Sequence, residues 1–212
     1  MTRRTLRSRS DTGASPVVGM SRAVIGLVSL VVSATIVTAQ TAPAAKVRAD
    51  AVTLSGPTVA GSFCSTAEFA VFHCSTGAKQ VSVCASRTAT PHTGSLRYLF
   101  GKPGATPEIT LPAKPTPPSR SASADTLMYS GGGGAWLRFR SGEYAYTVFT
   151  AMGRWGEGGA PAEREGLLVE RKGKRVAYLP CRKAAESQLG PALYEKLGLK
   201  TATPDESFEL PD

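Results

Sequence analysis

Histidine, catalytic motifs and long apolar runs are scarce in this chain of 212 residues, and each scarcity excludes a class of protein. Only His73 and His92 are present, and the cysteines are not paired as Cys-x-x-Cys, so we expect no metal site. The chain has no G-x-S-x-G elbow, S-x-x-K, H-E-x-x-H or phosphate-cradling G-x-x-x-x-G-K-[ST] motif. We therefore predict no catalytic residue and no cofactor, and the enzymatic alternative is a hydrolase without a recognisable motif.

The longest apolar run, residues 23–37, is too short to span a membrane, which needs about 20 apolar residues. It matches the apolar region of a signal peptide, with Arg22 before it and Val37-Thr38-Ala39 after it. We predict a signal peptide over residues 1–39 and cleavage after Ala39, with residues 42–44 as a second candidate. No cysteine directly follows the run, so we expect no stable membrane anchor after cleavage. The predicted location is periplasmic or secreted.

Removing the leader changes the charge. The whole chain has a formal net charge of +9, and the leader holds five arginines and one aspartate, so the remainder carries +5. The longest basic run is residues 171–175, and its central glycine predicts a hairpin turn. Such a mild surplus is unlike that of a nucleic-acid-binding domain, so we expect no nucleic-acid partner.

All four cysteines, Cys64, Cys74, Cys84 and Cys181, follow the leader. An even number of cysteines in an exported chain predicts two disulfides, for which three pairings are possible. We favour Cys74 with Cys84, across a short hairpin, and Cys64 with Cys181, which would fasten the start of the domain to its end.

The chain divides into four predicted parts. Residues 40–61 are small and polar, as in a linker, residues 62–200 form a single β domain, and residues 201–212 are an acidic tail that we expect to fray from Asp205. Short β-type runs with turn residues between them predict the strands, which are residues 69–72, 80–84, 95–100, 108–111, 135–140, 144–149, 167–169 and 176–179. Residues 112–125 are proline-rich and predict an extended loop. Residues 183–189 and 192–197 suit two short helices, with a break at Gly190-Pro191. The predicted fold is mostly β, a small antiparallel sandwich or barrel with short C-terminal helices.

The clearest element is the hairpin over residues 135–149. A two-residue loop, Gly142-Glu143, puts glycine first, as a type II′ turn requires. This register places an apolar set on one face, namely Leu137, Phe139, Tyr144, Tyr146 and Val148. It leaves Trp136, Arg138 and Arg140 on the other face, which is either a solvated face or a surface for an anionic or sugar-bearing partner. The four glycines at 131–134 either form a tight entry to this strand or admit a ligand close to the backbone.

Two resemblances bear on function. Residues 72–74, 81–86, 96–101, 131–139 and 142–146 resemble a group of exported proteobacterial proteins of unknown function, which implies a periplasmic or secreted β domain. Separately, Ser141-Gly142-Glu143-Tyr144 looks like the S-G-x-Y loop of the periplasmic inhibitors of invertebrate-type lysozyme, whose Ser and Tyr enter the acidic cleft of the lysozyme.

These observations lead to one functional prediction and two alternatives. We predict a non-enzymatic exported protein that binds a protein or glycan of the cell envelope, with Trp136, Arg138, Arg140, Ser141 and Tyr144 as candidate binding residues. The first alternative is a protein similar to the lysozyme inhibitors, and the second is the hydrolase without a motif.

Overall fold

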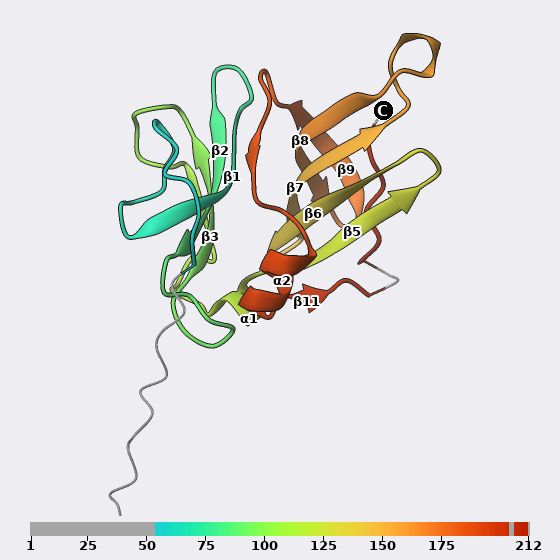
Figure 1. The fold of residues 1–212 in the computed structure, drawn as a ribbon. Helices are drawn as coiled ribbons and strands as arrows, with labels where there is room; N and C mark the ends of the chain where they lie inside the picture. Colours follow the sequence, from blue (N-terminus) through green and yellow to red (C-terminus); the bar gives the residue numbers. More distant parts are fainter. Residues whose placement is uncertain (1–53, 204–205, 212) are drawn as a thin grey trace, which may run out of the picture. The chain divides into compact units, whose positions relative to one another are not determined.

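A computed structural model describes residues 54–203 and 206–211, so the predicted signal peptide and most of the predicted linker lie outside the described residues. Two sheets pack against each other as a sandwich and do not close into a barrel (Figure 1). This confirms the mostly β prediction and decides between its two forms. Among the described residues no helix is long and apolar enough to cross a membrane.

The first sheet, sheet A, has the strand order β10-β1-β2-β3-β4, and all of its pairs are antiparallel. Its strands are β1 (Glu68–Ser75), β2 (Gln80–Ser86), β3 (Leu96–Gly101), β4 (Ile109–Leu111) and β10 (Glu186–Ser187). The short β10 lies in the segment predicted as a helix, and that prediction is wrong. Residues 183–189 are held extended because Gln188 donates its backbone N–H to Val71 and because Phe72 pairs with Ser187.

The second sheet, sheet B, has the order β11-β5-β6-β7-β8-β9. Its strands are β5 (Ser123–Tyr129), β6 (Gly132–Ser141), β7 (Tyr144–Gly153), β8 (Ala162–Arg171), β9 (Lys174–Pro180) and β11 (Lys200–Thr201). Only β11 runs parallel to its neighbour, β5. The predicted loop over residues 112–125 contains a short helix, α1 (Pro118–Ser121), and the first residues of β5. The other predicted helix is present as α2 (Pro191–Leu197), which begins at a proline, and the Tyr194 hydroxyl donates to the carbonyl of Trp136.

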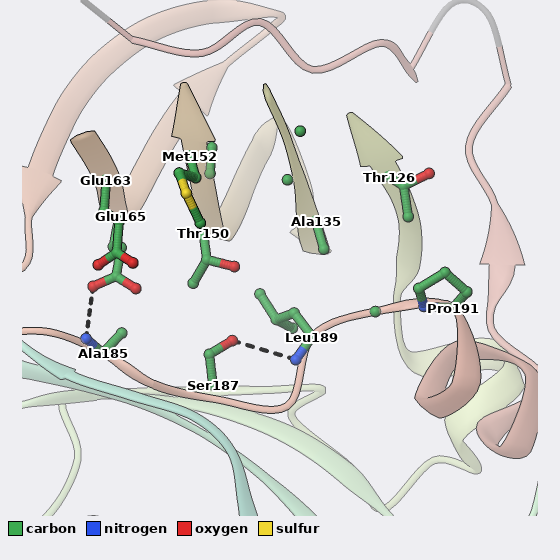
Figure 2. Close-up of a pocket in the computed structure, with 14 residues that line it drawn as sticks. Thr126, Ala135, Thr150, Met152, Glu163, Glu165, Ala185, Ser187, Leu189 and Pro191 are labelled. Carbon is green, nitrogen blue, oxygen red and sulfur yellow. Dashed lines mark hydrogen bonds between the residues drawn. The ribbon is translucent and has the colours of Figure 1, made fainter. Parts of the chain in front are cut away.

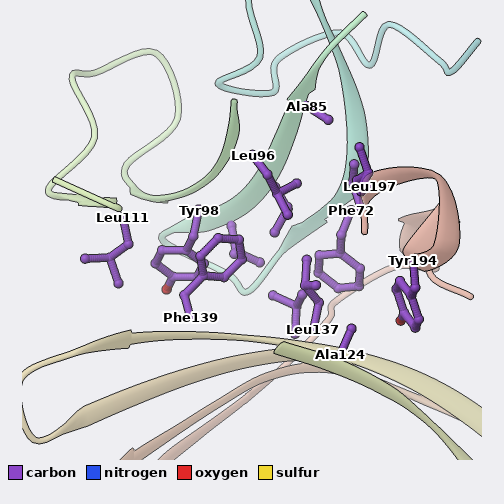
Figure 3. Close-up of a cluster of buried hydrophobic side chains, with 14 of the residues drawn as sticks. Phe72, Ala85, Leu96, Tyr98, Leu111, Ala124, Leu137, Phe139, Tyr194 and Leu197 are labelled. Atoms are coloured by element: carbon purple, nitrogen blue, oxygen red, sulfur yellow. The ribbon is translucent and has the colours of Figure 1, made fainter. Parts of the chain in front are cut away.

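The main core lies between the sheets (Figure 3). Alternation along β3 turns Leu96, Tyr98 and Phe100 inward, and alternation along β6 turns Leu137 and Phe139 inward to meet them, as predicted. The rings of Tyr98 and Phe139 lie 5.8 Å apart between centroids. Aromatic side chains bury large apolar areas, so this layer contributes strongly to the stability of the domain.

The outer face of sheet A is covered by the segment that precedes β1. Alternation along β2 points Gln80, Ser82 and Cys84 away from the core, and residues 61–64 lie across them. The Gln80 amide donates to the carbonyl of Gly61 at 2.7 Å, and the Ser82 hydroxyl accepts the backbone N–H of Phe63 at 3.1 Å. Leu54 is buried as well, so part of the predicted linker packs on the domain. We call residues 54–67 the N-terminal cover.

Two disulfides form, as predicted, but the favoured pairing is wrong. The bonds join Cys64 to Cys84 and Cys74 to Cys181. Cys74 faces the core and is paired in register with Val81, whereas Cys84 is paired with Ala70 and points to the outer face. Cys74 and Cys84 are therefore on opposite faces of sheet A, because Val81, the partner of Cys74, is three positions from Cys84 along β2, and they are too distant for the Cα–Cα spacing that a disulfide allows.

Candidate functional site

The predicted hairpin forms in the predicted register. Ser141 pairs with Tyr144, and Gly142 has a φ of 57°, as the first position of a type II′ turn requires. Leu137, Phe139 and Val148 are fully buried, and Tyr146 packs against the same cluster. Tyr144 has the same parity, but it is the first residue of β7, next to the turn, and 38% of it is exposed.

The opposite face of this hairpin, predicted to be either solvated or a surface for a partner, is closed at Trp136 and Arg138, which are therefore not accessible binding residues. Trp136 and Arg138 are 2% and 4% exposed, and only Arg140 reaches solvent. The cause is the end of the chain, which was expected to fray. Residues 206–211 lie across the outer face of sheet B, where the Phe208 ring is 5.8 Å from that of Trp136 and 5.1 Å from that of Phe149. We call residues 206–211 the C-terminal cover.

Arg138 is satisfied on all sides under this cover. Its guanidinium donates to the Thr147 hydroxyl at 2.8 Å and to the carbonyl of Glu206 at 2.8 Å, and it forms an ion pair with Glu170 at 3.2 Å. It also lies over the ring of Trp136 at 4.8 Å. Burial lowers the pKa of Arg138, but a guanidinium remains charged in proteins, so the partners offset the cost of burying that charge.

The exposed part of the hairpin is its turn, which is joined to the next turn along the sheet. Lys172 donates its backbone N–H to the carbonyl of Glu143 at 2.8 Å, and its ammonium group lies 2.8 Å from the Glu143 carboxylate. Arg171 forms an ion pair with the same carboxylate at 3.2 Å and lies over the Tyr144 ring at 5.7 Å. We call these two turns, residues 140–144 and 171–175, the double-hairpin tip.

The double-hairpin tip is basic. It carries five cationic side chains, which are Arg140, Arg171, Lys172, Lys174 and Arg175. Two of them share Glu143, and Arg140 pairs with Glu206 at 2.9 Å. A basin of about 820 Å³ lies between the tip and the C-terminal cover. The tip therefore presents an aromatic ring, the Ser141 hydroxyl and a surplus of positive charge on turns that are fastened together.

Comparison with protein-family models, with curated proteins and with solved structures finds no match for this chain. The geometry of its own residues is therefore the basis for any functional proposal.

A second hollow opens on the inner face of sheet B, beyond the edge of sheet A. This cleft has a volume of about 510 Å³ and lies between β5–β8 and the segment that carries β10 (Figure 2). Its floor is made of small residues, among them Gly133, Gly134 and Ala135, and Glu163 and Glu165 line one end. At Gly134 a Cβ would come within 2.5 Å of the Thr150 carbonyl oxygen, so this glycine is needed for the strand to pair. The glycine run thus forms a strand entry and also part of the cleft floor.

Glu165 is a group in this cleft whose pKa is shifted from its usual value. Burial raises the pKa of its carboxyl, the backbone N–H of Ala185 acts in the opposite direction from 2.6 Å, and the negative charge of Glu163 adds to the increase. A carboxyl with a raised pKa can donate a proton, and it can also simply bind a polar ligand. Among the residues that line the cleft, none is a histidine, cysteine or lysine that could act as a nucleophile or base beside it.

Sequence reasoning missed both the cleft and the C-terminal cover. A signal for each was present. Glu163 and Glu165 share the parity of Leu167 in β8, which places two acids on the face that points toward the core. Phe208 and Leu210 are separated by the acidic Glu209, and two apolar residues at this spacing are a pattern of one apolar face.

Proposed function

We propose that the protein is exported and non-enzymatic, and that it binds an acidic partner in the cell envelope through the double-hairpin tip. The observation that carries the proposal is the exposed ring of Tyr144 on a fastened turn among five cationic side chains. Tyrosine and arginine are enriched among the residues that dominate binding energy at protein interfaces. Turns that are already fastened lose little conformational freedom on binding, and a basic surface speeds the encounter with an acidic partner.

Export is supported by the disulfides and by the sequence of the leader. Both bonds have ordinary Cα–Cα separations, 5.3 Å and 5.6 Å, and such bonds persist in oxidising compartments. Cleavage at the predicted site leaves Gln40 as the first residue. The intact mass of the protein from its native host tests this, and a leader still attached to soluble cytoplasmic protein would contradict export.

The lysozyme-inhibitor alternative is the second candidate, because Ser141 and Tyr144 are both exposed on the turn that resembles the inhibitor loop. Their hydroxyls could enter an acidic catalytic cleft, with Arg140 and Arg171 adding attraction to its carboxylates. On this reading the acidic partner is a lysozyme. On the broader proposal it is another envelope protein.

The tip proposal is tested by photo-crosslinking in cells. A photoreactive amino acid replaces Tyr144 in one strain and Met152 in another. Met152 is a matched control because it is 51% exposed and lies at the opposite end of β7. We expect one envelope protein with an acidic surface to be crosslinked from position 144 and not from position 152. Equal crosslinking from both positions, or none from position 144, would refute the tip as the binding surface.

The inhibitor alternative has its own assay. The purified protein is added to invertebrate-type, animal and phage lysozymes, and the rate of cell-wall hydrolysis is measured. If the alternative is correct, Tyr144→Ala abolishes inhibition and lowers stability by less than about 1 kcal/mol, because the ring is at the edge of the core. Met152→Ala retains inhibition. A wild-type protein that inhibits none of these enzymes removes the alternative and leaves the broader proposal to the crosslinking experiment.

A further inference from the structure

The C-terminal cover occupies a groove that has the features of a peptide-binding site. Its floor is the outer face of sheet B, formed by Trp136, Phe149 and Leu168, with Tyr178 at the side. Phe208 fills the groove and is 7% exposed. An aromatic anchor that enters a pocket of aromatic and aliphatic side chains is the usual centre of a peptide interface.

Arginine side chains donate hydrogen bonds to backbone carbonyls at both ends of the C-terminal cover. Arg138 donates to the carbonyl of Glu206 at 2.8 Å, and Arg164 donates to the carbonyl of Pro211 at 3.1 Å. Arg140 pairs with the Glu206 carboxylate. Among the described residues no backbone–backbone hydrogen bond joins 206–211 to the sheet, so the cover is recognised by side chains and is not an added strand.

The chemistry of the groove matches that of its occupant. Three arginines bind a segment in which Glu206 and Glu209 flank the aromatic Phe208. When the segment is absent, Arg138 loses one acceptor, and the rings of Trp136 and Phe149 lose their contact with Phe208 and face water, which is unfavourable. A groove that is costly to leave empty favours occupation by a segment with the same features.

We propose that this groove is a peptide-recognition site that the chain keeps closed with its own residues 206–211. The partner that it fits is an extended segment of another protein with an aromatic residue between acidic ones. The site shares Arg140 with the double-hairpin tip, but its floor is the outer face of sheet B, so it does not depend on the function proposed above. A tethered segment competes at an effective concentration in the millimolar range for short linkers, so a partner binds well only when the cover is weakened or released.

The test uses the full chain and a fluorescent peptide with the sequence of residues 202–212. Phe208→Ala weakens the cover and leaves the floor of the groove unchanged. We expect the peptide to bind this variant at least about tenfold more tightly than it binds wild type, because the competing cover has lost its anchor. The same peptide with alanine in place of its phenylalanine is the matched control, and it should lose at least about tenfold in affinity for the variant.

A second variant and a folding check distinguish a loss of peptide binding from a loss of folding. Phe208→Leu retains an apolar anchor, so it should bind the peptide with an affinity between those of wild type and Phe208→Ala. Circular dichroism confirms that each variant is folded before binding is measured. Folded Phe208→Ala and Phe208→Leu variants that both fail to bind the peptide would overturn the proposal. Binding to wild type as tight as binding to the variants would also overturn it, because the groove would then not be closed by the cover.

Discussion

The two covering segments solve the same problem in different ways. Each lies on the outer face of one sheet and buries residues that alternation directs away from the core. The N-terminal cover is fixed covalently, because Cys64 is bonded to Cys84 in the sheet below it. The C-terminal cover is held by Phe208, by Arg138 and Arg164 and by one ion pair. The difference teaches that one cover is held by a covalent bond while the other is held by noncovalent contacts.

The largest loss of unfolding free energy is expected when the disulfide between Cys74 and Cys181 is removed. Cys74→Ser with Cys181→Ser removes the disulfide that links β1 to the end of β9 across 107 residues. On the loop-entropy model this costs about 4.8 kcal/mol of unfolding free energy. Chemical denaturation of the double variant measures it. A loss below about 2 kcal/mol would show that noncovalent packing alone holds the two sheets together.

Removing the bond of the N-terminal cover should cost less. Cys64 and Cys84 are separated by 20 residues, for which the same model gives about 3.3 kcal/mol. We expect the Cys64→Ser, Cys84→Ser variant to unfold at a lower denaturant concentration than wild type but to retain the core. Limited proteolysis should then cut within residues 54–67 before any other region. Protection of this segment in the variant would show that the disulfide is not what fixes the cover.

Phe208→Ala tests the noncovalent cover. A buried phenylalanine in a rigid core costs 3–5 kcal/mol when it is replaced by alanine, and we expect about 2 to 3 kcal/mol here because the segment can leave the sheet and no cavity has to remain. Exposure of Trp136 should shift its fluorescence to longer wavelength before global unfolding. Phe139→Ala, in the main core, is the matched control and should show no such early shift. Identical behaviour of the two variants would mean that the cover is as integral as the core.

A carboxylate makes the N-terminal cover sensitive to acid. Burial alone would raise the pKa of Glu68, but the backbone N–H of Ser65 and the Arg97 guanidinium, with the Ser65 hydroxyl, hold it below its usual value. The stability from this group is therefore complete above the pKa of the unfolded chain and is lost as the pH falls toward the lower folded pKa. Glu68→Gln should cost about 1.5 kcal/mol at pH 7, where its hydrogen bonds to charge are lost. The gap between wild type and variant should shrink below about pH 4.5 in thermal melts. A gap that does not change with pH would refute the role of this charge.

The smallest effect concerns the ion pair of the C-terminal cover. Arg140 is half exposed and Glu206 is partly exposed, and such pairs contribute little. Glu206→Gln should change the unfolding free energy by no more than about 0.5 kcal/mol. A loss as large as that of Phe208→Ala would show that the ion pair, and not the aromatic ring, holds the cover on the sheet.

Local pattern predicted much of the fold. Alternation and turn residues fixed the hairpin around Gly142-Glu143 and the strand pairing of its two arms, because both depend on neighbours in sequence. Residues 183–189 were misassigned because pairing with β1, far away in sequence, overrides their helical propensity. The disulfide pairing was predictable in part. Cys84 has the opposite parity to the inward-facing Val83, so it lies on the outer face of sheet A. That Cys74 lies on the other face follows only from the register of the hairpin.

The candidate site was less predictable than the fold. The alternation correctly assigned Trp136 and Arg138 to the outer face but could not say what lies on that face. Their burial depends on a segment about 70 residues further along the chain, and no local pattern encodes that contact. Ser141 and Tyr144 are exposed because they flank the turn, and the position of that turn was predictable from local pattern.

The position of the C-terminal cover in the sequence has a consequence during synthesis. Residues 206–211 leave the ribosome after every strand of sheet B, so the aromatic face under Phe208 is bare on the nascent chain until the last of them emerge. Large exposed apolar patches are where folding chains associate wrongly, and chaperones exist to counter this. A chaperone that holds the chain would therefore find Trp136 and Phe149 available for longest, and would lose its binding surface when the cover closes.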